Sequence, residues 1–97
     1  MRYRLDPAAR DEYREAAERY LAVSPRIAAA FVDQVESAIR QVRENPAIWR
    51  ALEGDVRRCL VRRFPFGIYF TIEHEEIVVW AIMHLHRQPG YWRARRV

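Results

Sequence analysis

The sequence contains no lysine, a single cysteine and only three glycines among its 97 residues. One cysteine, Cys59, excludes an intramolecular disulfide, and a chain without disulfides is typical of a reducing compartment. Only three histidines stand beside that cysteine, so we do not expect a four-ligand zinc site. The sequence has no glycine-rich phosphate loop, no nucleophile elbow and no pair of carboxylates at metal-ligand spacing. We therefore expect neither a metal ion nor a cofactor.

Long apolar runs are missing as well. The longest, Ile77 to Met83, is far too short to cross a bilayer. The region from Arg2 to Arg19 is charged and contains no apolar segment of the kind found in signal peptides. We therefore expect a cytoplasmic protein without a membrane-spanning segment. Apolar residues make up 51% of the chain, which is enough for one modest core and argues against disorder. A chain of this length is expected to form one domain over residues 1–97.

Positive charge is concentrated in the second half of the chain. Residues 1–53 carry nine arginines and nine acids, whereas residues 54–97 carry eight arginines and four acids and so supply the whole net charge of +4. The exclusive use of arginine fits the coding bias of a GC-rich genome. The excess of arginine over acidic residues in the second half indicates an anionic partner, because the arginine fork suits phosphate and carboxylate groups.

The first half of the chain predicts a short strand and two helices. Met1 to Leu5 alternates like a strand. Asp6-Pro7 and Ser24-Pro25 each pair an N-cap residue with a proline, which predicts one helix to about Ala22 and a second that ends at Asn45-Pro46. The connection is short enough for an antiparallel hairpin. The predicted apolar stripes are Ala9, Tyr13, Ala16, Ala17, Tyr20 and Leu21 on the first helix, and Ile27, Phe31, Val35, Ala38, Ile39 and Val42 on the second.

After Pro46 the pattern becomes that of strands. We expect a turn or helical fragment over Ala47 to Gly54, strands over Val56 to Arg63, Ile68 to Ile72 and Ile77 to Met83, and turns at Phe64 to Gly67 and at His74-Glu75. Three strands joined by short turns predict an antiparallel meander with the helical hairpin on one face. The central strand should be one of the last two, because both are apolar on both faces. The expected class is α+β.

Two groups of residues are candidates for function. Arg57, Arg58, Arg62 and Arg63 flank one strand on both faces without an intervening acid, which fits either an anionic partner or a solvated edge strand that resists self-association. The other group follows the last strand and consists of His84, His86, Arg87, Tyr91, Trp92 and Arg93. The histidines suit proton transfer or phosphate contact, or simply a solvated strand end. The two aromatic residues suit an exposed binding platform, or ordinary core.

Nearly the whole chain resembles the RelE/ParE toxin superfamily, and its ParE branch more than its RelE branch. The residues that carry the resemblance are Arg63-Phe64-Pro65-Phe66, the run E-I-V-V-W-A-I-M-H that ends at His84, and Arg87-Gln88-Pro89-Gly90-Tyr91-Trp92, in that order. The resemblance implies a compact α+β toxin of a type II toxin–antitoxin, or plasmid stabilisation, system. It further implies a bacterial cytoplasmic setting and a cognate antitoxin that wraps around the toxin and neutralises it.

The superfamily divides by target. RelE-like members cleave messenger RNA on the ribosome with arginine or lysine for phosphate stabilisation and another side chain for proton transfer, whereas ParE-like members poison DNA gyrase and have no established catalytic set. Here Gly67 stands about where the ribonucleases carry an arginine, and lysine is missing altogether. Only Arg87, with His86 nearby, matches the catalytic pattern. A phosphoryl-transfer transition state needs several converging charges, so half a set argues against catalysis.

The resemblance therefore favours a ParE-like toxin that inhibits its target, DNA gyrase, by binding. The expected target-binding residues are Arg57, Arg58, Arg62, Arg63, His84, His86, Arg87, Tyr91, Trp92 and Arg93. The alternative is a RelE-like, ribosome-dependent mRNA endoribonuclease with His86 and Arg87 as catalytic residues, whose partners would be the ribosome and mRNA. A third possibility is an inactive relic that retains only antitoxin binding.

Overall fold

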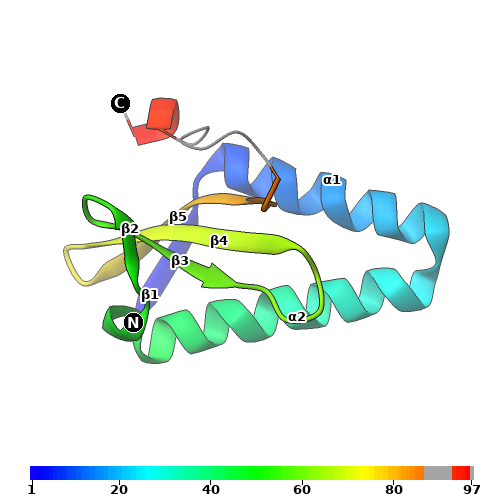
Figure 1. The fold of residues 1–97 in the computed structure, drawn as a ribbon, viewed down its shortest axis with the longest axis horizontal. Coiled ribbons are helices and arrows are strands. Elements are labelled where there is room, and N and C mark those ends of the chain that lie inside the picture. Colours follow the sequence, from blue (N-terminus) through cyan, green and yellow to red (C-terminus); the bar gives the residue numbers. More distant parts are fainter. Residues whose placement is uncertain (87–92, 97) are drawn as a thin grey trace.

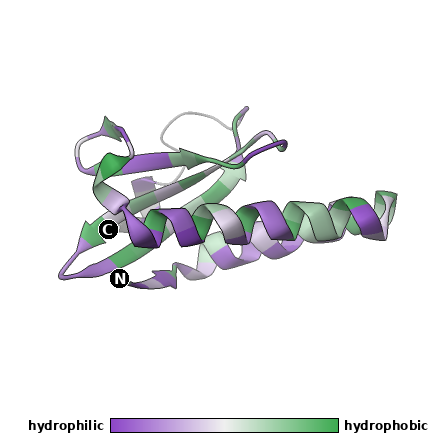
Figure 2. Cartoon of the chain, turned by 90° about the horizontal axis from the view of Figure 1, so that it is seen from below, coloured by the Kyte–Doolittle hydropathy of each residue, from purple (hydrophilic) through white to green (hydrophobic). Residues whose placement is uncertain are grey.

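The computed structural model describes residues 1–86 and 93–96. In chain order, the elements are β1 (Arg2–Leu5), α1 (Pro7–Val23), α2 (Pro25–Glu44), the 3-10 turn η1 (Pro46–Ile48), β2 (Ala51–Glu53), β3 (Val56–Leu60), β4 (Phe66–Glu73), β5 (Glu76–His84) and the 3-10 turn η2 (Arg93–Arg96). The two helices form an antiparallel hairpin that packs against a five-stranded sheet (Figure 1). Figure 2 shows the helices as one layer and the strands as the other. The predicted α+β class is confirmed.

Both helices begin at the predicted cap and proline pairs. The carboxylate of Asp6 accepts a hydrogen bond from the backbone N–H of Ala8 at 3.1 Å, and the hydroxyl of Ser24 accepts one from the backbone N–H of Arg26 at 3.1 Å. Ser24 is also the C-cap of α1, so one residue ends the first helix and starts the second. This short connection folds α2 back along α1. Asn45 caps the end of α2, as predicted.

The strand order in the sheet is β1-β5-β4-β3-β2, so β4 is the central strand. Strands β3, β4 and β5 form the predicted antiparallel meander, whereas β1 pairs with β5 in parallel. The turn between β4 and β5 consists of His74 and Glu75, whose φ angles are 49° and 63°. A two-residue hairpin turn of type I′ requires positive φ at both central positions, so this turn agrees with the prediction.

Three predicted boundaries differ from the structure. The segment expected to be a turn or helical fragment contains η1 and also the edge strand β2. Strand β3 ends at Leu60, before the predicted Arg63, and β4 begins at Phe66 inside the predicted turn. All three residues of β2 are exposed, so the strand has no buried face that would leave an alternating pattern in the sequence.

The main core lies between the helical hairpin and the face of the sheet that it covers, here called the inner face. Phe31 is fully buried there, and its ring centroid lies 4.9 Å from that of Tyr20, 5.1 Å from that of Phe66 and 5.3 Å from that of Phe64. Two residues of the predicted stripes are exposed instead, namely Leu21 at 54% and Ile27 at 38%. Both lie near the helix connection, where the hairpin extends past the sheet (Figure 1).

A smaller cluster covers the opposite, outer face of the sheet. It consists of Val56, Tyr69, Ala81 and Met83. On the same face, the indole N–H of Trp80 donates to the hydroxyl of the fully buried Thr71 at 2.9 Å. Trp80 occupies a bulge opposite the step from Tyr69 to Phe70, where the register shifts. Among the described residues, neither α1 nor α2 combines the length and apolar composition needed to cross a bilayer.

Candidate target-binding surface

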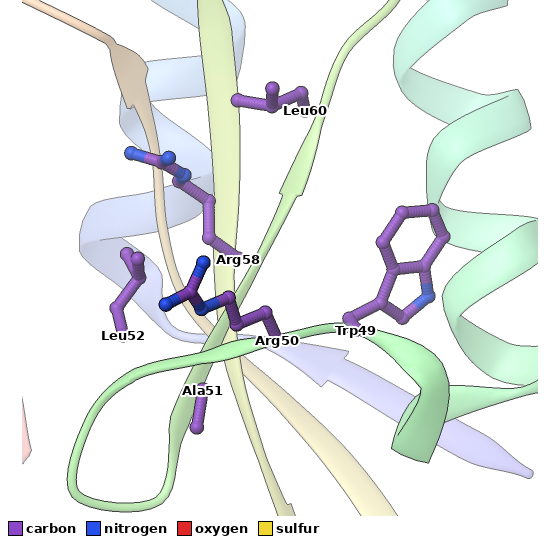
Figure 3. Close-up of a pocket in the computed structure, with 6 residues that line it drawn as sticks. All are labelled: Trp49, Arg50, Ala51, Leu52, Arg58 and Leu60. Carbon is purple, nitrogen blue, oxygen red and sulfur yellow. The ribbon is translucent and has the colours of Figure 1, made fainter.

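A pocket of about 410 Å³ opens beside the edge strand β2, and its lining combines arginine with exposed leucine (Figure 3). Arg50 and Arg58 extend to the same side of the strands. Leu52 and Leu60 line the same pocket and are 46% and 52% exposed. The ring of Trp49 points the other way, toward α2, where it packs against the core. The pocket therefore offers two cationic groups beside an apolar wall, a combination suited to a protein segment that carries both acidic and apolar side chains.

Arg58 extends over Gly67 on the outer face. Arg58 lies opposite Tyr69 in the β3–β4 register, yet its side chain leans toward the beginning of β4. A Cβ atom at Gly67 would lie 3.1 Å from Cδ of Arg58 and 3.1 Å from Cε1 of Tyr69, closer than nearly all real Cβ contacts. Gly67 thus provides the space for the Arg58 side chain. A β4 arginine of the kind that RelE-like ribonucleases carry here would have to displace Arg58.

The neighbouring Arg57 is directed to the inner face and bound to the backbone. Its Nη1 donates to the carbonyl of Trp49 at 2.6 Å and to that of Ala47 at 3.2 Å. These bonds tie η1 and the residue that follows it to β3. Arg62 and Arg63 are exposed in the turn between β3 and β4, and Arg63 adopts a positive φ of 70° there.

The two histidines lie at the end of β5, on the helix side of the sheet. His84 faces Phe66 across the β4–β5 register, with ring centroids 5.4 Å apart. The backbone N–H of His86 donates to Nδ1 of His84 at 3.1 Å, and the two rings lie 5.0 Å apart. The backbone N–H of Leu85 donates to the carbonyl of Pro65 at 2.9 Å, which holds the histidines beside the turn of Arg62 and Arg63.

The predicted target-binding residues therefore lie at several separate positions on the structure. Arg58 lies on the outer face with Arg50, whereas His84 and His86 lie on the helix side near the exposed turn. Arg93, in η2, forms an exposed ion pair with Glu53 of β2, with a shortest distance of 2.6 Å. Arg87, Tyr91 and Trp92 lie outside the described residues.

Some residues of this surface were not predicted. Arg50 and Leu52 were not predicted because β2 was taken as a turn, whereas Leu60 lies in the predicted strand on the same face as Arg58 but was not among the candidate residues. The signal that could have found Arg50 and Leu52 is Gly54, whose φ of 58° marks the tight connection that folds β2 onto β3 and brings Arg50 beside Arg58. The sequence analysis also did not single out Glu12 and Arg95. These two residues form an ion pair at 2.7 Å in which both side chains are nearly buried. Nothing in the sequence connects two residues that stand 83 positions apart.

Comparison with known proteins finds a matching family and a solved structure of similar fold. The family described as "ParE toxin of type II toxin-antitoxin system, parDE" matches residues 3–89. Among solved structures, a chain of a chromosomal ParDE toxin–antitoxin system from P. aeruginosa superposes with a TM-score of 0.76 at 18% identity, covering 87% of this chain and 95% of that one. The search of curated proteins found no significant match.

Proposed function

This chain belongs to the ParE toxin family of type II toxin–antitoxin systems, and we propose that it inhibits DNA gyrase by binding and is neutralised by a cognate antitoxin. Gyrase as the target follows from the ParE branch that the sequence resembles. Because gyrase acts on the bacterial chromosome, the protein would act in the bacterial cytoplasm as a single toxin domain.

The observation that favours binding over catalysis is that the sheet separates Arg58 from the two histidines. Arg58 fills the space over Gly67 on the outer face, and the imidazoles of His84 and His86 lie on the helix side. A phosphoryl-transfer site needs cationic groups and a proton-transfer group aimed at one reacting centre. Arg58 and the histidines lie on opposite faces and do not aim at one centre, so a ribonuclease site here would depend on the exposed Arg62 and Arg63 beside the histidines.

The outer face has the features of a protein-binding surface instead. The pocket of Arg50, Leu52, Arg58 and Leu60 puts two guanidinium groups beside two exposed leucines. Arginine is enriched at the energetic centres of protein interfaces, where a charged group acts beside apolar contacts that exclude water. We propose that this pocket, together with Trp92 and its aromatic neighbour Tyr91, contacts the target.

An antitoxin partner is supported by a second surface on the helical hairpin. A groove of about 510 Å³ lies between α1 and α2 near their connection and includes the exposed side chain of Leu21. Its lining is mostly apolar, and charged side chains such as Arg14, Glu18 and Asp33 stand among the lining residues. Large apolar grooves with polar rims mark interaction sites. We propose that an apolar segment of the antitoxin covers this groove, away from the outer face.

Two alanine variants separate binding from ribonuclease activity. If the toxin acts by binding, Trp92→Ala should abolish growth inhibition, because truncating a central aromatic residue commonly costs about 2 kcal/mol or more. His86→Ala should then have little effect, because no proton is transferred. For a ribonuclease the order reverses, since losing a general acid or base lowers the rate by about 10²–10⁴. Circular dichroism and capture by the antitoxin establish that both variants fold.

A charge reversal tests the outer-face pocket directly. Arg58→Glu should strongly reduce growth inhibition and leave antitoxin capture unchanged. The matched control is Arg40→Glu, the same charge change at an exposed position of α2. Equal effects of the two variants would show that only net charge matters and would reject the pocket as a target site. Messenger cleavage that requires ribosomes and is lost in His86→Ala would replace the gyrase proposal by the ribonuclease alternative.

A further inference from the structure

The edge of β5 changes partner halfway along its length. Strand β1 pairs with β5 from Arg2 opposite Glu76 to Leu5 opposite Val79. The backbone N–H of Asp6 still donates to the carbonyl of Val79 at 2.9 Å, and the chain then turns away into α1. Beyond Val79, no other strand of the described residues pairs with this edge of β5. The next backbone groups on this edge need other partners, because buried N–H and C=O groups are costly when unpaired.

Two side chains take the place of the missing strand. Oε1 of Glu12, on α1, accepts a hydrogen bond from the backbone N–H of Ile82 at 3.1 Å. Nη1 of Arg95, in η2, donates to the carbonyl of Trp80 at 3.0 Å. The two side chains also bind each other, with Nη1 to Oε1 at 2.7 Å and Nη2 to Oε2 at 3.0 Å. The pair therefore satisfies both edge groups and its own charges at once.

The Glu12–Arg95 pair is far better enclosed than the other contact of the C-terminal turn. The side chains of Glu12 and Arg95 are 11% and 12% exposed, whereas Arg93 and Glu53 in their ion pair are 59% and 50% exposed. Solvent screens exposed pairs and leaves them weak. A nearly buried pair is held firmly, because removing one partner leaves the other as an uncompensated charge away from solvent. The Glu12–Arg95 pair is thus the stronger of the two attachments.

We propose that Glu12 is a positioning residue that fixes the turn η2 against α1 and β5, and thereby orients the C-terminal part of the target-binding surface. Arg93, one of the proposed target-binding residues, lies in this turn. Arg93 reaches Glu53 on β2 while Arg95 reaches β5, although β3 and β4 separate these strands in the sheet. The orientation of η2 therefore depends on a residue of the first helix. This inference rests on the proposed binding function.

The test compares Glu12→Gln with Glu15→Gln, the same change at an exposed position of the same helix. Hydrogen exchange of the full chain bound to its antitoxin should show the amides of residues 94–96 exchanging at least about tenfold faster in Glu12→Gln only, because the glutamine oxygen can still accept from Ile82 but no longer carries the charge that pairs with Arg95. Growth inhibition should fall at least about tenfold, because a displaced turn weakens binding to the target. Capture by the antitoxin, through the hairpin groove, should stay within about twofold.

A charge swap tests whether the contact between the side chains at positions 12 and 95 is what growth inhibition requires. Glu12→Arg and Arg95→Glu should each impair growth inhibition. The double variant should restore it, because Glu at position 95 can accept from Ile82 while Arg at position 12 donates to Trp80. Failure of the swap to restore inhibition, or equal loss of antitoxin capture and inhibition in Glu12→Gln, would overturn the proposal. So would unfolding of both Glu12→Gln and Arg95→Gln. If the parent protein leaves gyrase unaffected, the proposed function fails, yet the exchange rates still decide whether Glu12 holds the turn.

Discussion

Replacing Phe31 with alanine should lower the free energy of unfolding by about 3–5 kcal/mol, because it removes a fully buried ring and leaves a cavity. The rings of Tyr20, Phe64 and Phe66 all lie within 5.3 Å of the Phe31 ring, centroid to centroid. They come from both layers of the fold, so the cavity cannot close by moving one element. A domain of this size has a total stability of about 5–15 kcal/mol, so the variant would keep only a small margin.

Urea unfolding followed by circular dichroism measures this loss. The slope of the free energy of unfolding against urea concentration should stay unchanged if the substitution alters stability alone. The thermal midpoint should fall by about 12 °C or more, since 1 kcal/mol corresponds to about 4–8 °C in a domain of this length. Leu21→Ala on the same hairpin is the matched control, because its side chain is 54% exposed. It should change stability by at most about 0.5 kcal/mol. A Phe31→Ala loss as small as that of Leu21→Ala would refute the placement of Phe31 at the centre of the core.

Three further perturbations have defined outcomes. Thr71→Val removes the hydroxyl that accepts the Trp80 indole N–H at 2.9 Å, so urea unfolding should show a loss of about 1–3 kcal/mol, and an unchanged stability would contradict this buried bond. Burial raises the pKa of the Cys59 thiol to about 11 from 9.0, so Ellman's reagent at pH 8 should react slowly with the folded protein and rapidly in urea. Because the folded state holds this proton more tightly, the contribution of Cys59 to stability is complete below pH 9 and should be lost as the pH rises through about 11, which urea unfolding at each pH would detect. Gly67→Ala places a Cβ 3.1 Å from Cδ of Arg58 and 3.1 Å from Cε1 of the buried Tyr69, so growth inhibition should weaken as Arg58 moves aside, and the thermal midpoint should fall because the tyrosine ring must also shift.

Much of the fold follows from local signals in the sequence. Asp6 and Ser24, each before a proline, start the two helices where they were expected, and Phe31 is buried as its stripe predicted. Leu21 belongs to the same kind of stripe but is exposed, because helical period alone does not tell how far the sheet extends beneath the hairpin. Strand β2 was missed for a related reason, since a three-residue exposed edge strand carries no alternation.

Less of the candidate site than of the fold could be predicted from the sequence. The rings of His84 and His86 lie side by side, 5.0 Å apart, but the side of the sheet on which they lie depends on the register that sets Phe66 opposite His84. A shift by one residue would have put both imidazoles on the same side as Arg58. The pairing of Glu12 with Arg95 depends on the tertiary fold alone, because the two residues stand 83 positions apart in the sequence.

The most direct test of the central claim is a titration of purified toxin into purified gyrase, with supercoiling of plasmid DNA as the readout. Inhibition by binding predicts that activity falls in proportion to the toxin added and stops falling when gyrase is saturated, and that addition of the antitoxin restores it. The Arg58→Glu variant should need a higher toxin concentration than the parent for the same inhibition of supercoiling. The Arg40→Glu variant should inhibit at the same concentration as the parent. Undiminished supercoiling at saturating toxin, together with cleavage of messenger RNA on translating ribosomes by the same preparation, would contradict the account.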